Sequence, residues 1–234
     1  MHPSSKWNRH RSHQTFLVIL ALAGFLPCGG CSRGPSLIKP PYYEPEKIGG
    51  RAVELYDQDG DGQLSATELK ACPGIASSMK KYDTDGDGKV SAEEIAHRVQ
   101  FWIDSRSGIQ GCMFKVTLNG RPLASGRVEL DPEPFLAGIV PAATGKIGRS
   151  GVTSPSAAAE DLPAGVKGGM RCGIYKLRIT HPKLQVPACY NTETELGLEI
   201  GPDFDFFNPP IFSLRNHVKI LPRSNHRRRR VSVP

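Results

Sequence analysis

Apolar residues recur at helical spacing in the first half of the chain and in short, strand-like runs in the second half. Val53 and Tyr56 have counterparts in Met79 and Tyr82, 26 residues later. Val53 and Tyr56 are three positions apart, as are Met79 and Tyr82, so the two residues of each set lie on the same face of a helix. This matched placement predicts two helices that contribute to one shared core.

The bounds of the helices follow from the same pattern and from proline. We expect the first helix to begin at residue 46 or 47 and to end at Tyr56. Pro73 must end the next helix near residue 72, because proline lacks the N–H that continues a helix. A longer helix is expected from Ser91 to about Asp104, with three apolar residues turned towards the core: Ile95, Val99 and Trp102.

One acidic, glycine-rich pattern occurs twice, at residues 56–69 and 82–95, and nine of its fourteen positions are identical. Aspartate stands at the first, third and fifth positions of a twelve-residue loop, glycine at the sixth and glutamate at the twelfth. An ordinary acidic turn would need neither the final glutamate nor the apolar residue at the eighth position. Both segments resemble the calcium loop of the EF-hand family, and with their flanking helices they cover residues 46–104.

The resemblance implies that the two loops bind two Ca²⁺ ions through oxygen ligands. In an EF-hand loop the seventh position contributes a backbone carbonyl and the twelfth a bidentate carboxylate. Ser65 and Ser91, at the ninth position, would act directly or through water. In paired EF-hands, Leu64 and Val90 would face each other in a short two-stranded contact. The implied ligands are Asp57, Asp59, Asp61, Gln63 and Glu68 in the first loop, and Asp83, Asp85, Asp87, Lys89 and Glu94 in the second.

From Gly111 onwards, short β-like runs alternate with Gly and Pro. Strands are expected at residues 112–118, 127–130, 173–180, 196–200 and 204–207. Asn119-Gly120 predicts a hairpin turn, and residues 145–169, rich in Ala, Ser, Gly and Pro, are expected to form a mobile loop. The fold class that follows is α+β and multidomain, with a helical EF-hand pair followed by a small antiparallel β-sandwich.

Short motifs in this second half resemble the carboxypeptidase-regulatory-like, or transthyretin-like, β-sandwiches of secreted planctomycete-type proteins. They are residues 116–123 with 126–130, residues 173–180, and residues 186–191 followed by 196–200. The resemblance covers about residues 112–214 and implies a non-catalytic module that accompanies other domains. Residues 145–169 stand where that family has a compact turn, so the middle of the sheet departs from its pattern.

A basic segment at the start of the chain precedes an apolar run of eleven residues, Phe16–Leu26. The run is too short to span a membrane as a helix, and the pattern is typical of a secretory signal. Residues 26–31 resemble a bacterial lipoprotein signal in which Cys31 becomes lipidated, and plain secretion is the alternative. Residues 32–45 contain four prolines and are expected to form a tether.

The expected organisation is a signal peptide at 1–31, a tether at 32–45, the EF-hand pair at 46–104, a linker at 105–110, a β-sandwich at 111–221 and a basic tail at 222–234. The formal net charge of +7 comes from three basic residues of the leader and from Arg227–Arg230. Such a tail can bind anionic envelope polymer or lipid, or remain solvated. The export signal places it away from nucleic acid.

Four cysteines follow the leader, in a chain whose export signal implies an oxidising compartment. We expect one disulfide between Cys172 and Cys189 and a second between Cys72 and Cys112. Free thiols are the alternative, because the sequence does not show which cysteines lie close together.

The chain has no His-Glu-x-x-His helix, nucleophile elbow, Walker loop or dinucleotide fingerprint, so we expect no enzyme. The predicted function is an exported, lipid-anchored calcium-binding protein of the bacterial cell envelope, with structural Ca²⁺ and an unidentified protein or envelope-polymer partner. Two alternatives stay open. One is a dockerin-like docking module, which would lack a helix before Asp57, and the other is an accessory domain of a secreted enzyme system.

Overall fold

The computed structural model describes residues 38–215 and 219–220 of the 234-residue chain. The predicted signal peptide with Cys31, part of the predicted tether and the Arg227–Arg230 tail lie outside the described residues. The described residues belong to one compact unit, which begins at Leu37. None of its described helices is both long enough and apolar enough to cross a membrane.

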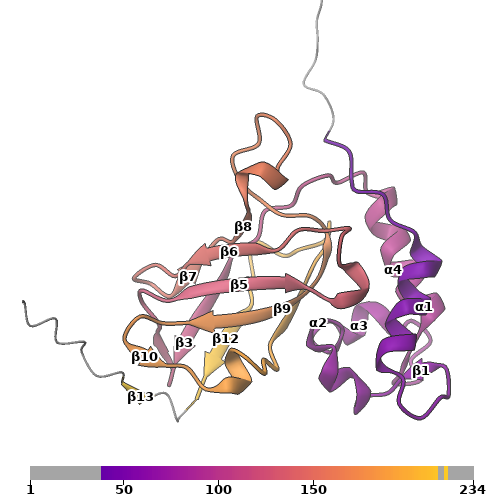
Figure 1. Cartoon of the computed structure of the whole chain (residues 1–234), viewed down its shortest axis with the longest axis horizontal. Helices are drawn as coiled ribbons and strands as arrows, with labels where there is room; N and C mark the ends of the chain where they lie inside the picture. The colour runs from indigo at the N-terminus through magenta and orange to yellow at the C-terminus, as the bar shows by residue number, and fades with distance from the viewer. Residues whose placement is uncertain (1–37, 216–218, 221–234) are drawn as a thin grey trace, which may run out of the picture. The chain divides into compact units, whose positions relative to one another are not determined.

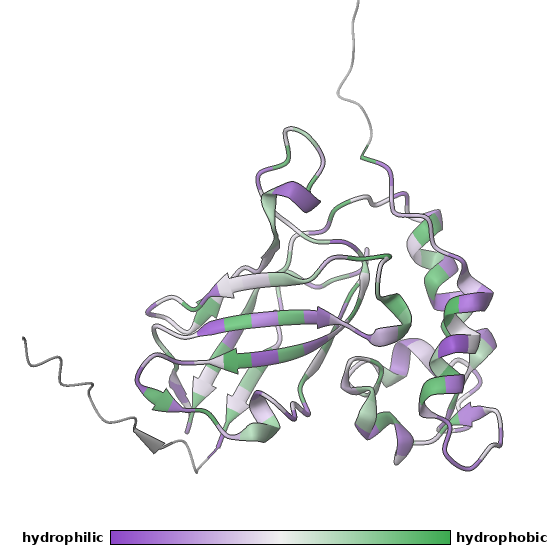
Figure 2. Ribbon diagram, viewed as in Figure 1, coloured by the Kyte–Doolittle hydropathy of each residue, from purple (hydrophilic) through white to green (hydrophobic). Residues whose placement is uncertain are grey.

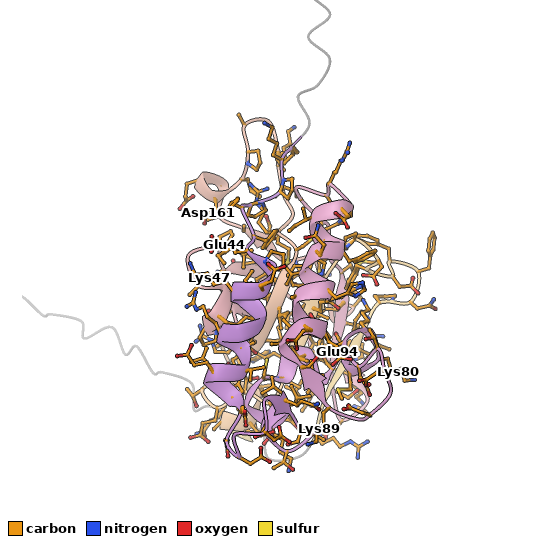
Figure 3. The ribbon with its side chains drawn as sticks, turned by 90° about the vertical axis from the view of Figure 1, so that its right-hand side faces the viewer. Glu44, Lys47, Lys80, Lys89, Glu94 and Asp161 are labelled. Atoms are coloured by element: carbon orange, nitrogen blue, oxygen red, sulfur yellow. The ribbon has the colours of Figure 1, made fainter. Side chains whose placement is uncertain are left out.

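The helical part consists of two longer helices and several short ones (Figure 1). The longer helices, α1 and α4, lie side by side, and Figure 3 shows them from the side of the molecule that they cover. The expected bounds are confirmed to within a residue or two at each end. The helices are α1 (Pro45–Tyr56), η1 (Glu68–Ala71), α2 (Pro73–Ala76), α3 (Met79–Tyr82) and α4 (Ala92–Asp104).

The inner faces of α1 and α4 are apolar at the positions that helical spacing selects. Tyr56 is buried and Val53 is partly buried on α1, and Ile95 and Val99 are buried on α4. Trp102 is also fully buried, with the ring of Tyr43 packed edge-on at 5.8 Å between centroids. The predicted core position of Trp102 is therefore confirmed.

The β-rich part contains a five-stranded antiparallel sheet in the order β11-β9-β5-β6-β8. A second sheet has the order β12-β3-β4, with β7 also paired to β3, and β10 pairs with β13. The strands are β3 (Phe114–Leu118), β4 (Arg121–Pro122), β5 (Arg127–Pro132), β6 (Ala143–Lys146), β7 (Val152–Thr153), β8 (Ser156–Ala157), β9 (Gly173–Thr180), β10 (Leu184–Gln185), β11 (Gly197–Ile200), β12 (Ile211–Leu214) and β13 (Lys219–Ile220). Three short 3-10 helices connect them, η2 (Pro134–Leu136), η3 (Ala159–Asp161) and η4 (Ala188–Tyr190).

Alternation along the strands separates a buried face from an exposed one. Along β5, Val128 and Leu130 are fully buried, whereas Arg127, which directly precedes Val128, is exposed. Figure 2 shows hydrophobic and hydrophilic colours alternating along this strand. Leu130 and Val116 of the other sheet belong to the same core cluster, which also includes Trp102 of α4. The helical and β-rich parts thus share one continuous core.

All four residues of β11 are buried, although an edge strand normally exposes one face. Helix α2 covers this strand, with Pro73 and Ile75 buried against the β-rich part. The carboxylate of Glu199 is therefore enclosed within β11 rather than directed to solvent. The buried Glu199 carboxylate thereby becomes a point of contact between the helical part and the β-rich part.

The expectation of a purely antiparallel β-rich part is wrong at one place, because β12 pairs with β3 in parallel. The expected strand at 204–207 is also absent. The Asp205 carboxylate accepts hydrogen bonds from the N–H groups of Phe207 and Asn208, at 2.8 and 3.0 Å, and this turn bends the chain before β12 begins.

Residues 145–169 do not form the expected mobile loop. Val152 pairs with Lys115 of β3, and Ser156 pairs with Thr144 of β6, so this stretch adds a strand to each sheet. The hairpin at Asn119-Gly120 is confirmed. Both residues have positive φ, 51° and 78°, as the two-residue turn that joins β3 to β4 requires.

The two predicted disulfides are not formed, because Cys72, Cys112, Cys172 and Cys189 are all free. Cys172 directly precedes β9, and the chain runs the eight residues of this strand before it turns back towards η4, where Cys189 lies. η4 contacts β9, and the Cys189 carbonyl accepts from the N–H of Glu195, next to the point where Leu196 bonds to Leu177. Cys172 lies five residues before Leu177, which is about 16 Å along the strand. The three other thiols are buried, and burial raises the pKa of Cys112 and of Cys172 to about 12.

Candidate metal centre

The first acidic loop begins where α1 ends. The carboxylates of Asp57, Asp59 and Asp61 converge, so that one oxygen from each lies within 4.8 Å of the others. Gly62 has a φ of +83°, a conformation that a side chain would strain, and the chain turns there as the sixth position of a calcium loop requires. Three of the predicted ligands of this loop are thus brought together.

Hydrogen bonds from the backbone hold the loop in this shape. The Asp57 carboxylate accepts from the N–H of Gly60 at 2.7 Å and from that of Gly62 at 2.9 Å. The N–H of Gln63 donates to Asp61 Oδ1 at 2.9 Å, which places the seventh residue beside the fifth. The loop is therefore preorganised around its carboxylates.

Glu68, the predicted twelfth ligand, closes the first loop by hydrogen bonds and is not part of the three-carboxylate group. Its Oε1 accepts from the N–H of Gln58 at 2.7 Å, and its Oε2 accepts from the N–H and the hydroxyl of Ser65 at 2.8 and 2.6 Å. The Ser65 hydroxyl, followed by the backbone donors, lowers the pKa of Glu68 to about 2. The carboxylate is ionised at neutral pH, as a calcium ligand must be.

The second loop repeats this arrangement. Asp83, Asp85 and Asp87 form an equivalent group of converging carboxylates, and Gly88 has a φ of +84°. The N–H groups of Gly86 and Gly88 donate to Asp83 at 2.7 and 3.1 Å. The duplication seen in the sequence is thus a duplication of geometry.

Glu94 closes the second loop and also lies in the first turn of α4 (Figure 3). Its carboxylate accepts from the N–H of Thr84 at 2.8 Å and from that of Ser91 at 2.9 Å, and the Ser91 hydroxyl accepts in turn from the N–H of Glu94. This capping box fixes the first turn of the helix. Partial burial opposes ionisation of Glu94, but these hydrogen bonds outweigh it and lower its pKa.

The two loops are joined by the short strands β1 (Gln63–Leu64) and β2 (Val90–Ser91). Leu64 pairs with Val90 in antiparallel register, and both side chains are fully buried. The predicted contact between the eighth positions is confirmed. Since each strand belongs to one loop, ordering of one loop constrains the other.

Lys89 has a role that the sequence alone does not indicate. Its backbone stands at the seventh position of the second loop, while its ammonium group forms an ion pair with Asp61 of the first loop. The hydrogen bond to Lys89 lowers the pKa of Asp61 and raises that of Lys89. One ligand of the first loop is therefore held by a cation from the second, at the lower edge of the molecule in Figure 3.

Tyr56, the last residue of α1, ties the first loop to the β-rich part. Its hydroxyl donates to Glu133 Oε2 at 2.7 Å, and Lys176 Nζ of β9 lies 3.5 Å from the same oxygen. Glu133 is fully buried, and burial raises its pKa above the usual value. Its Oε1 has no hydrogen-bond partner among the described residues.

Residues that flank the second loop make a second set of polar contacts with the β-rich part. Arg98 of α4 donates to Glu199 Oε1 at 2.6 Å and to Asp203 Oδ1 at 2.7 Å. Trp102 Nε1 donates to the same Glu199 oxygen at 3.0 Å, and Lys81 Nζ of α3 lies 3.4 Å from the other one. Burial alone would lower the pKa of Arg98, but the hydrogen bonds and attraction of Glu199 and Asp203 raise it.

The donor set of each loop suits Ca²⁺, a hard cation that prefers carboxylate and carbonyl oxygens in a flexible shell. Three aspartates from each loop would hold an ion. The same loops offer further oxygen atoms. These are the carboxylates of Glu68 and Glu94 and the seventh-position carbonyls of Gln63 and Lys89. The hydroxyls of Ser65 and Ser91, expected to act on the ion, are used in hydrogen bonds to these glutamates.

Comparison with protein-family models agrees with this geometry. The EF hand model matches residues 54–73 and 75–99, which contain both loops. Neither the curated proteins nor the solved structures give a match to the chain. The matched segments and the two groups of converging carboxylates together identify residues 54–99 as an EF-hand pair, and this chain as a calcium-binding protein.

Proposed function

We propose that the protein is an exported, lipid-anchored protein of the cell envelope in which two Ca²⁺ ions act as structural elements. One observation carries the structural role. Each acidic loop is flanked by residues that hydrogen-bond to buried carboxylates of the β-rich part, Tyr56 to Glu133 and Arg98 to Glu199. Ions that order the loops therefore also fix the helices that present these contacts.

This arrangement favours a structural role over that of a calcium switch. A calcium sensor opens its helices and exposes an apolar groove to a target. Here the apolar residues of the pair, such as Ile75 and Trp102, lie in one core cluster with residues of the strands. Opening the pair would expose this shared core.

The helix before the first loop distinguishes the pair from a dockerin-like module, which we expect to lack it. Residues 45–56 form α1, and Asp57 follows directly. In an exported setting, the affinity for calcium can be as weak as about 10⁻⁴ to 10⁻³ M, because extracellular calcium modules work in that range. The β-rich part would serve as a non-catalytic, sandwich-type binding module.

Removal of the loop-closing glutamates tests the structural role. Calcium at about 100 times its dissociation constant adds about 2.7 kcal/mol per site, which is about 5–10 °C in Tm for a chain of this size. The wild type should gain this stability from calcium, and a Glu68→Ala/Glu94→Ala variant should gain little of it. Glu93→Ala, an exposed neighbour of Glu94, is the matched control and should respond like the wild type.

The proposal fails if calcium leaves the Tm of the wild type unchanged, or raises that of the double glutamate variant by the same amount. Anchoring is tested separately by radiolabelled palmitate in a bacterial host. Label should enter the wild type and Cys28→Ser, but not Cys31→Ser. Equal labelling of Cys31→Ser, or no labelling of the wild type, would exclude an anchor at Cys31.

A further inference from the structure

One row of side chains on the exposed face of the five-stranded sheet carries positive charge without a partner. In the register of the sheet, Arg127 of β5 lies directly opposite Lys146 of β6 on one side and opposite Thr180 of β9 on the other. Arg127 and Lys146 are exposed, and neither forms an ion pair with another described residue. The hydrophilic ends of β5 and β6 lie next to each other in Figure 2.

The carboxylates that could neutralise this row are already engaged. Glu129 and Asp131 follow Arg127 on the same face of β5, and both pair with Arg178 of β9. Like charges placed directly opposite on adjacent antiparallel strands destabilise a sheet. The Arg127–Lys146 pair is therefore unfavourable unless an anion lies between the two side chains.

A hollow is present at this row. It has a volume of about 480 Å³, and Arg127, Lys146 and Thr180 line it together with Ser125 and His181, while no acidic residue does. The side chain of His181 is engaged in the loop itself, since Nδ1 accepts from two backbone N–H groups and Nε2 lies 2.8 Å from the carbonyl oxygen of Ala124. Two cations and the hydroxyl of Thr180 remain for a ligand.

We propose that Arg127, Lys146 and Thr180 form a binding site for a dianionic tetrahedral oxyanion of the phosphate class. Directly opposite residues have Cβ atoms about 4.5–5.5 Å apart, so a guanidinium and an ammonium group can reach one anion. The fork of an arginine matches phosphate geometry, and lysine adds a point charge. This site is separate from the calcium loops and does not depend on the function proposed for them.

Binding of inorganic phosphate to the full chain tests the site, with calcium only sufficient to fill the loops. In equilibrium dialysis, Arg127→Gln/Lys146→Gln should weaken phosphate binding by about tenfold or more, since two charge-assisted hydrogen bonds are lost. Thr180→Val should weaken it by a smaller factor. Lys183→Gln, an exposed cation outside the row, should change it less than twofold, which separates a built site from general attraction. A variant with Arg227–Arg230 replaced by glutamine removes the contribution of the tail.

Thermal unfolding keeps the test independent of folding defects. Without phosphate, the Arg127→Gln/Lys146→Gln variant should be as stable as the wild type or more so, because a repulsion is removed. Phosphate should then raise the Tm of the wild type and not that of the variant. A variant that binds phosphate as well as the wild type, or a wild type whose binding depends only on the arginine tail, would overturn the proposal.

The source of the phosphate group is distinguished with vesicles. Binding of inorganic phosphate without sedimentation on phosphatidic acid vesicles, whose headgroup is a phosphate monoester, would indicate a soluble phosphate compound. Sedimentation of the wild type, lost in the Arg127→Gln/Lys146→Gln variant but retained when the tail is replaced, would indicate a lipid headgroup. Binding of neither probe would refute the site.

Discussion

The contact of Arg98 with Glu199 should contribute strongly to the stability of the whole protein. The side chains of Arg98 and Glu199 are 9% and 0% exposed, and the nitrogen and oxygen atoms are 2.6 Å apart. Replacing Arg98 by methionine keeps the aliphatic stem but leaves the buried carboxylate with only Trp102 and the more distant Lys81 as partners. Loss of one partner from a buried pair costs about 3–5 kcal/mol.

Because Lys81 partly compensates, we expect the lower end of this range, about 3 kcal/mol. For a chain of this size, this corresponds to a fall in Tm of about 6–12 °C. Urea unfolding in saturating calcium measures the change, followed by circular dichroism and by the fluorescence of Trp102. Arg51→Met, on the exposed side of α1, is the control and should unfold like the wild type.

A double-mutant cycle isolates the interaction itself. In Arg98→Met/Glu199→Gln no charge is left unpaired at this position, so the double variant should be more stable than the two single effects predict, by about 1 kcal/mol or more. Additive effects, or a stability of Arg98→Met within about 0.5 kcal/mol of the wild type, would refute the view that this pair fastens the EF-hand part to the β-rich part.

Other substitutions test separate features of the structure. Gly49→Ala should cost about 1–3 kcal/mol of folding stability, because the added methyl group would lie 2.1 Å from a backbone oxygen of α4. Gly50→Ala places its methyl group in open space and should stabilise the protein by up to about 1 kcal/mol. The reverse order of stability in urea unfolding would contradict the close approach of the two helices. Lys89→Met should raise the calcium affinity of the first loop about two- to fivefold, since the cation that competes for Asp61 is removed, and a weaker affinity in calorimetric titration would show that the ion pair assists binding. Burial raises the pKa of Glu133 in the folded protein, so folding favours the protonated carboxyl. The folding stability that this protonation contributes is complete below the usual glutamate pKa of about 4.3 and is lost as pH rises through the raised pKa. The stability of Glu133→Gln relative to the wild type should therefore improve as pH rises above about 4.3, and a difference that is independent of pH would be evidence against this burial effect.

The calcium loops could be predicted from sequence because their chemistry is local. Each loop takes its aspartates, glycine and closing glutamate from twelve consecutive positions, and the spacing alone fixes their roles. The pairing of Leu64 with Val90 follows for the same reason, since it connects equivalent positions of two repeats. The core position of Trp102 also follows from helical spacing within one segment.

The partners of the loops could not be predicted, because they depend on contacts between distant parts of the chain. Glu199 stands 101 positions after Arg98, and nothing in its neighbourhood shows that α2 would cover β11 and bury it. Its place in an otherwise apolar run, Leu198-Glu199-Ile200, was the available signal. The expected strand at 204–207 was wrong because apolar residues there suggested a strand, while the Asp205 side chain bends the backbone instead.

The parallel pairing of β3 with β12 constrains the order in which the chain can fold. Thr117 and Ser213 of these neighbouring strands are 96 positions apart, and their hydroxyls form a hydrogen bond of 3.2 Å. Closing so long a loop has a large entropic barrier, and pairings of this kind slow folding. The two calcium loops pair through local contacts and can form early, whereas the core of the EF-hand pair is complete only when the β-rich part packs against it. The second sheet must wait until Leu214 has been synthesised, so a chain that stops short of β12 would leave β3 with an unpaired edge.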